Sequence, residues 1–163
     1  MLRSHAFSFG KKLGHRDSPR NAFGCTRFIV NDDSLILPVV AAVIERCGMF
    51  LICQRADHKQ QGGLWEFPGG KLEGDESLFE AARRELNEEL NVRVTNCGPV
   101  LFETLDTTLK YSINFAEVTI EGEPNVIEHQ QICWVPKERL LTYKLAPADR
   151  KFVFHYFRAT DAK

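Results

Sequence analysis

GKLEGDESLFEAARRELNEELNV, residues 70–92, carries the strongest pattern in the 163-residue chain. Apolar side chains recur in it at spacings of three and four, which predicts an amphipathic helix over residues 77–90. Asp75 is a candidate N-terminal cap for this helix. The apolar stripe, which would fix the helix to a core, consists of Phe79, Ala82, Leu86 and Leu90.

Three glutamates share a second face of this helix. Glu85, Glu88 and Glu89 stand at positions i, i+3 and i+4, and their face is centred roughly 120° from the stripe. Like charges at this spacing destabilise a helix by roughly 0.2–0.5 kcal/mol, which suggests a compensating cation. Grouped carboxylates suit Mg²⁺ or Mn²⁺, and these ions suit phosphate oxygens. A solvated acidic face is the alternative, and the three glutamates alone leave both interpretations open.

The surrounding residues resemble the Nudix box, G-x5-E-x7-R-E-U-x-E-E-x-G-U, in which U is a bulky aliphatic residue. At average residue usage, such a match arises by chance on the order of 10⁻⁸ times per starting position. The last glycine of the box is Asn91 here, and asparagine tolerates the left-handed backbone expected after the helix. The matching residues are Gly70, Glu76, Arg84, Glu85, Leu86, Glu88, Glu89 and Val92.

The resemblance covers roughly residues 37–158 and is closest to the MutT branch of Nudix hydrolases. The late segment is especially similar to the bacterial CTP/5-methyl-dCTP pyrophosphohydrolases of that branch, and the chain also resembles 8-oxo-dGTP diphosphatases. The resemblance implies an α/β (α+β) Nudix fold, a mixed β-sheet sandwiched between helices, over residues 35–160. The segments that carry it besides the box are 54–55, 64–73, 122–124 and 145–149.

The resemblance also implies a metal site that holds Mg²⁺, with Mn²⁺ as a substitute. The ion would neutralise phosphate charge and activate or orient the attacking water. Glu128 matches a further loop glutamate that reaches the metals, or alternatively is a loop carboxylate in water. The candidates for the general base are Glu85, Glu88 and Glu128. Arg84 would orient a box glutamate, with Gly70 and Glu76 in support. The implied metal ligands are Gly69 through its carbonyl, Glu85, Glu88 and Glu89.

Four further residues match substrate positions of the family, and each has a plainer alternative. Arg55 and Lys110 match basic positions used on phosphates or near the sugar, although surface cations are common. Phe67 matches a hydrophobic wall for the base, or is a core phenylalanine. Asp149 matches an Asn or Asp that reads the base edge, or caps a helix. His129 is interpreted as structural or solvated.

The implied reaction is Mg²⁺-dependent hydrolysis of nucleoside triphosphates, chiefly modified or non-standard (d)NTPs, to monophosphate and pyrophosphate. This would be nucleotide-pool sanitation, a contribution to DNA repair. The alternatives are an RNA 5′-pyrophosphohydrolase, an NDP-sugar or dinucleotide hydrolase, and a non-catalytic nucleotide-binding module. Such modules usually lose box carboxylates, and all are present here.

The composition limits other functions. Lys and Arg number 21 against 22 Asp and Glu, and this net charge of −1 argues against coating nucleic acid. The longest apolar run, residues 35–44, is shorter than the about 20 residues of a membrane-spanning helix. Five cysteines without Cys-x-x-Cys argue against a disulfide framework or structural zinc. We expect a cytoplasmic monomer or homodimer that binds nucleotides, without membrane or long nucleic acid as partner.

The first 34 residues differ from the rest of the chain. Residues 1–30 hold six basic side chains and one aspartate, a local net charge of +5, without helical or strand periodicity. A flexible arm is the favoured interpretation. An organelle transit peptide is a second interpretation, because such peptides are basic and poor in acids, and a third is that Met1 is not the natural start.

The remaining elements follow from periodicity and turn residues. Two apolar runs, residues 35–45 and 49–54, predict a hairpin. The dipeptide Gly98-Pro99 predicts a turn. Further strands are expected at residues 64–67, 100–107, 110–120 and 131–135, and helices at residues 137–142 and 149–159, the last with an apolar stripe of Phe152, Val153, Tyr156 and Phe157.

Overall fold

A computed structural model describes the backbone of residues 36–160 and the side chains of residues 36–156. The predicted basic arm, residues 1–34, lies outside the described residues. No helix in the described part is long and apolar enough to cross a membrane. The elements are β1 (Leu37–Val43), β2 (Glu45–Arg46), β3 (Met49–Gln54), β4 (Trp65–Glu66), β5 (Gly69–Lys71), α1 (Leu78–Leu90), β6 (Arg93–Asp106), β7 (Tyr111–Glu121), β8 (Gln131–Pro136), the 3₁₀ helix η1 (Lys137–Thr142) and α2 (Pro147–Thr160).

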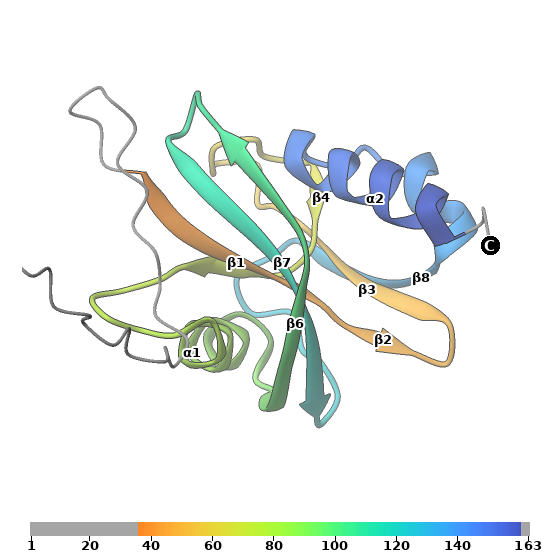
Figure 1. Cartoon of the computed structure of the whole chain (residues 1–163). Helices are drawn as coiled ribbons and strands as arrows, with labels where there is room; N and C mark the ends of the chain where they lie inside the picture. Colours follow the sequence, from red (N-terminus) through yellow and green to blue (C-terminus); the bar gives the residue numbers. More distant parts are fainter. Residues whose placement is uncertain (1–35, 161–163) are drawn as a thin grey trace, which may run out of the picture.

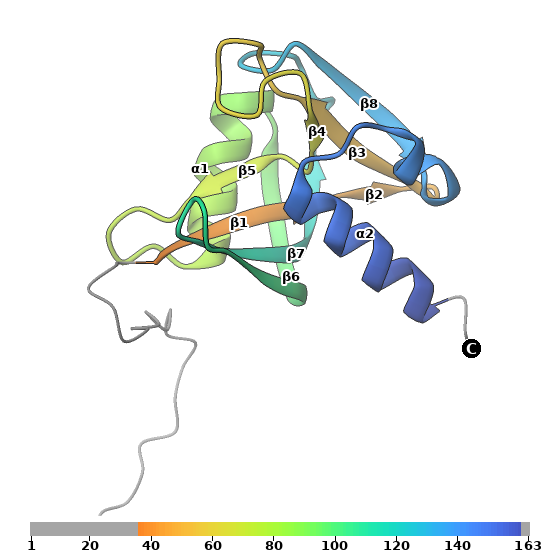
Figure 2. The same ribbon diagram turned by 90° about the horizontal axis from the view of Figure 1, so that it is seen from above.

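Two β-sheets form the centre of the fold (Figure 1). The first has the strand order β5-β1-β7-β6, in which β1 and β7 are parallel and the other neighbours are antiparallel. In the second, β3 pairs with β2, β4 and β8. Figure 2 shows α1 and α2 on opposite sides of β1 and β7. The predicted mixed sheet between helices is therefore confirmed.

Strand β1 separates two hydrophobic cores, because its side chains alternate between them. Val40 and Ala42 belong to the core that contains α1, whereas Ala41 and Val43 belong to the core that contains α2. A continuous apolar run is typical of a strand that is covered on both faces, and β1 has this environment. Helices α1 and α2 thus pack against opposite faces of β1, which fixes their relative positions.

Helix α1 has a different cap from the predicted one. The Ser77 hydroxyl accepts from the backbone N–H of Glu80, and the Glu80 carboxylate accepts from the backbone N–H of Ser77. This reciprocal pair is a capping box, so Asp75 is not the cap. Asn91 ends the helix in the left-handed conformation that was predicted, with φ 53° and ψ 43°. The fully buried members of the stripe are Ala82, Leu86 and Leu90.

Helix α2 begins at Pro147, so Asp149 lies inside its first turn and does not occupy the N-cap. The helix packs inward through Phe152, which stacks on Phe115 of β7 with ring centroids 4.5 Å apart. The side chain of Phe157, the last member of the predicted stripe, lies outside the described residues.

The predicted hairpin over residues 35–45 and 49–54 is wrong in its first strand. Strand β1 joins the other sheet, and the pairing with β3 is limited to Glu45 and Arg46 and to the Ile44 carbonyl, which accepts from the Leu51 N–H at 3.0 Å. The turn residues Cys47 and Gly48 have φ values of 51° and 75°, as in a two-residue hairpin turn. The chain therefore crosses from one sheet to the other at the end of β1.

Two glycine-containing segments lie within strands, including the Gly98-Pro99 dipeptide that was predicted as a turn. Gly69–Lys71 forms β5 and pairs with β1. Gly98 and Pro99 lie inside β6, where a register shift between Cys97 and Val100 marks a bulge. Pro99 has no partner in β7 within this bulge, so its missing N–H costs no ladder hydrogen bond.

Candidate active site

Arg84 on α1 joins the loop before the helix to the glutamates on it. Its Nε and Nη2 donate to the Glu76 carboxylate at 2.9 and 2.8 Å, and its Nη1 donates to Glu85 at 2.8 Å. Nη2 also donates to the Lys71 carbonyl at 2.9 Å. The hydrogen bonds from Arg84 lower the pKa of Glu76 to about 2. Glu76 therefore stays ionised and holds Arg84, which in turn orients Glu85.

Two adjacent glycines allow β5 to approach its neighbours closely. A Cβ on Gly70 would lie 2.2 Å from the Glu85 carboxylate, so a larger residue would take the space of this glutamate. A Cβ on Gly69, which has φ 144°, would lie 2.2 Å from the Val40 carbonyl oxygen. The Gly69 N–H donates to Glu89 Oε2 at 3.1 Å. One glycine thus leaves room for a box glutamate, and the other orients a second one.

Glu89 is the most buried of the three box glutamates. Its side chain is 11% exposed, compared with 18% for Glu85 and 53% for Glu88. Burial, together with the negative charges of Glu66 and Glu85, raises the pKa of Glu89 to about 8. Because a nearby cation favours the ionised form, these carboxylates form a region that a bound cation would stabilise.

The loop between β7 and β8 brings Glu128 toward the box. The backbone N–H groups of Asn125 and Ile127 donate to the last carbonyls of α1 at 2.8 and 3.2 Å. Glu128 pairs with Lys59 at 2.8 Å, and this contact lowers the pKa of Glu128. The charge of Glu128 also contributes to the raised pKa of Glu89. Glu128 therefore lies near the box, with its carboxylate held by Lys59.

The chemistry of these donors fits a hard divalent cation. The set holds three helix carboxylates, one loop carboxylate and a backbone carbonyl, which are all oxygen donors of the kind that Mg²⁺ prefers. Within residues 36–156, no three His, Cys, Asp or Glu side chains already converge on one point closely enough to hold an ion. Two of the carboxylates are held elsewhere, Glu85 by Arg84 and Glu128 by Lys59. Binding an ion therefore requires rotations of side chains that are already neighbours.

Two polar residues beside these carboxylates, the half-buried Glu66 and the buried His129, were not predicted as site residues from the sequence. Both oxygens of Glu66 accept from Arg55 Nη1, at 2.8 and 2.5 Å. His129 Nε2 lies 3.4 Å from Glu66 Oε1 and 3.8 Å from Glu89 Oε1. The available sequence signals are weak: Glu66 lies within the MutT-like segment 64–73, and His129 follows Glu128 directly.

Asp149 and Phe67, which are 82 positions apart in the chain, are joined by a hydrogen bond. Asp149 Oδ1 accepts from the Phe67 backbone N–H at 2.8 Å. Burial raises the pKa of Asp149 to about 8, and the charge of Glu66 acts in the same direction. The Phe67 ring is 3% exposed and packs edge-on against Phe152, with centroids 5.3 Å apart. This placement is that of a core phenylalanine, whereas Asp149 is a buried polar group beside the box region.

Lys110 lies apart from the carboxylates. It occupies the turn between β6 and β7 with φ 57°, and its carbonyl accepts from the Leu37 N–H at 2.9 Å. Gly69 pairs with Ala41, which is four residues after Leu37 in β1. At the usual rise per strand residue, Leu37 and Ala41 are roughly 13 Å apart along the strand. A phosphate-binding role for Lys110 stays a prediction.

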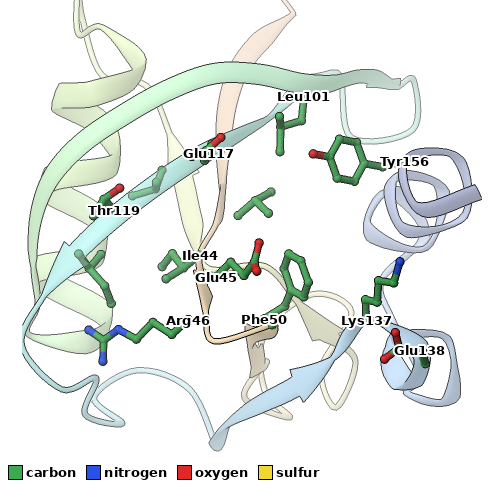
Figure 3. A pocket seen from close by; sticks show the side chains of 14 residues that line it. Ile44, Glu45, Arg46, Phe50, Leu101, Glu117, Thr119, Lys137, Glu138 and Tyr156 are labelled. Atoms are coloured by element: carbon green, nitrogen blue, oxygen red, sulfur yellow. The ribbon is translucent and has the colours of Figure 1, made fainter. Parts of the chain in front are cut away.

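A cavity of about 510 Å³ lies between the ends of the two sheets (Figure 3). Phe50, Leu101 and Tyr156 line it, together with charged residues such as Glu117 and Lys137. None of the predicted site residues lines this cavity. The carboxylate region and the cavity are thus separate features of the fold.

Comparisons with known proteins agree with one another. The NUDIX domain family model matches residues 36–156. A CTP pyrophosphohydrolase of Escherichia coli K12 is 40% identical over 116 residues, which cover 70% of this chain and 86% of that protein. An 8-oxo-dGTP diphosphatase of Proteus vulgaris is 44% identical over 66 residues, 40% of this chain and 59% of that protein. A solved MutT structure, from work on Aliivibrio salmonicida and Vibrio cholerae, has 33% identity and a TM-score of 0.65, and the match covers 76% of this chain and 98% of that one.

Proposed function

The chain belongs to the Nudix family as a MutT-like hydrolase, and we propose that it cleaves nucleoside triphosphates to a nucleoside monophosphate and pyrophosphate with Mg²⁺ as cofactor. The observation that carries this proposal is the gathering of box glutamates around β5. Arg84 orients Glu85, and the Gly69 N–H orients Glu89. Relatives named for CTP and for 8-oxo-dGTP support triphosphates as the substrate class.

The proposed roles follow from position. Bound Mg²⁺ would supply charge neutralisation of the phosphates and a lower pKa for the attacking water. Glu88, the most exposed box glutamate, is held only by a 3.8 Å ion pair with Arg84, and Glu128 becomes available when Lys59 releases it. The general base is one of Glu85, Glu88 and Glu128. The proposed ligands are the carbonyl of Gly69 and the carboxylates of Glu85, Glu88 and Glu89.

We assign recognition of the base to Asp149. A buried carboxyl whose pKa is about 8 is mostly protonated at neutral pH, so it offers both a donor and an acceptor. Such a group can accept from an exocyclic amino group and donate to a ring nitrogen or carbonyl. This pair of hydrogen bonds suits cytosine, and it also suits modified purines that combine amino and carbonyl groups. Nucleotides of cytosine and of modified purines are therefore the proposed substrates, and removal of the non-standard ones from the nucleotide pool is the proposed role.

A panel of nucleotides tests this proposal. Pyrophosphate release would be measured with Mg²⁺, and with excess chelator, on CTP, 5-methyl-dCTP, 8-oxo-dGTP, 2-hydroxy-dATP and the four ordinary dNTPs. We expect metal-dependent release from one or a few of these nucleotides. The panel would also hold ADP-ribose and a 5′-triphosphorylated RNA oligomer. Cleavage of either of these, with no cleavage of any triphosphate nucleotide, would overturn the substrate class.

A further inference from the structure

His129 lies between two carboxylates that belong to different parts of the site. Its Nε2 is 3.4 Å from Glu66 Oε1 on β4 and 3.8 Å from Glu89 Oε1 on α1. The side chain is 4% exposed, so solvent does not compete strongly for this nitrogen. A ring nitrogen that faces two acceptors acts as a donor, which places its hydrogen on Nε2.

The ring has few other constraints that would set its orientation. Nδ1 is buried and has no hydrogen-bond partner among the described residues. The backbone is fixed on both sides of His129, since Ile127 N–H donates to the Glu89 carbonyl and Gln130 N–H donates to the Gln54 carbonyl at 2.9 Å. The loop backbone therefore fixes the position of the imidazole. The ring nitrogen that has polar neighbours, Nε2, is directed at the two carboxylates.

These contacts complete a chain of polar groups across the site. Arg55 Nη1 donates to Glu66, Glu66 faces His129, and His129 faces Glu89. The other oxygen of Glu89 accepts from the Gly69 N–H at 3.1 Å. One oxygen of Glu89 is thus hydrogen-bonded by the backbone of β5, and the other faces His129 of the β7–β8 loop at 3.8 Å, a distance that a small shift of either side chain would close to a hydrogen bond.

We propose that His129 is a positioning residue that holds the Glu89 carboxylate for metal binding and links it, through Glu66, to Arg55. This inference rests on the proposed function, because it takes Glu89 as a metal ligand. A polar residue beside a metal ligand can orient that ligand and raise metal affinity, and loss of such a partner typically lowers affinity by about 10- to 100-fold. His129 fits this role better than that of a filler of the core, because a filler would need no polar partner.

The test compares two amides at position 129. A glutamine nitrogen reaches roughly the place of imidazole Nε2, whereas an asparagine nitrogen reaches only that of Nδ1. Mn²⁺ binding to the nucleotide-free full chain would be measured by the loss of the free-ion EPR signal. We expect H129N to weaken Mn²⁺ binding by about 10-fold or more, and H129Q to lie closer to wild type than to H129N. The exposed His58→Asn variant is the matched control and should bind Mn²⁺ as wild type does.

Equal Mn²⁺ affinity in wild type and H129N, or equal losses in H129N and H129Q, would overturn the proposal. A measurement on the wild-type protein covers the case in which H129N does not fold. The ¹⁵N resonance of His129 Nε2 should shift when Mg²⁺ saturates the site, because the ion withdraws electron density from the Glu89 carboxylate that this nitrogen faces. An unchanged resonance at saturation would also overturn the proposal.

The outcomes separate this inference from the proposed function. A wild-type protein that releases pyrophosphate from triphosphates, with H129N binding Mn²⁺ normally, would remove only the positioning role. A wild-type protein that shows the expected Mn²⁺ pattern and cleaves no triphosphate would remove only the proposed function.

Discussion

Replacing Asp149 with asparagine should change how the stability of the protein depends on pH. Burial raises the pKa of Asp149 from 3.8 to about 8 in the folded state. Below pH 3.8 the carboxyl is protonated in both states, so it causes no loss. Between the two values only the unfolded state ionises, so folding takes up a proton and the free energy of unfolding falls as the pH rises. Asparagine keeps the shape and an oxygen that can accept from the Phe67 N–H, and it has no proton to take up.

The magnitude follows from the interval between the two pKa values. One proton of uptake changes the unfolding free energy by about 1.36 kcal/mol per pH unit. From pH 5 to pH 7, D149N should therefore gain about 2.7 kcal/mol of stability relative to wild type. Glu89, whose pKa is also raised, is present in both proteins and cancels in the difference.

Urea unfolding at pH 5, 6 and 7, with chelator present, measures this difference directly. The exposed Asp75→Asn variant removes the same charge elsewhere and is the control for net charge. A gap between D149N and wild type that stays constant from pH 5 to pH 7 would contradict a raised pKa for Asp149, because it would mean that Asp149 is ionised in the folded protein at pH 5.

Three further substitutions test separate parts of the account. E88Q should abolish pyrophosphate release, because it removes a proposed metal ligand, and it should leave the thermal midpoint unchanged or higher, because it relieves repulsion among the box glutamates. Substantial residual turnover would contradict the ligand role of Glu88. G70A should lower kcat by about 10- to 100-fold with little change in urea midpoint, because its Cβ would displace the Glu85 carboxylate. L86A should lower the unfolding free energy by about 2–5 kcal/mol, since Leu86 is fully buried; a loss below 1 kcal/mol in urea titration would show that the α1 core collapses around the cavity.

The parts of the fold that sequence could predict are those that local pattern determines. The stripe of α1 and the left-handed Asn91 follow from spacing and from residue preference, and the structure has both. The prediction of Asp75 as the N-terminal cap of α1 was wrong, because Ser77 and Glu80 make two reciprocal hydrogen bonds, whereas Asp75 alone would make one. Strand β5 was missed because its glycines look like a break until Val40 is placed beside them.

The parts of the site that were missed depend on contacts distant in sequence. Glu66 and His129 are separated by 63 positions in the chain, and neither has a local pattern that marks it. Their proximity follows from the pairing of β3 with both β4 and β8, which sequence periodicity does not reveal. The ion pair of Lys59 with Glu128 has the same origin, since it joins two loops at the end of β3.

We propose that the box glutamates support metal-dependent cleavage of a nucleoside triphosphate between its α- and β-phosphates. This proposal is tested by identifying the products that wild type and E88Q form from the best nucleotide of the panel, with Mg²⁺ and with chelator. We expect monophosphate and pyrophosphate in equal amounts from wild type with Mg²⁺ alone, and none from E88Q. Nucleoside diphosphate with orthophosphate, or equal turnover with chelator present, would contradict it.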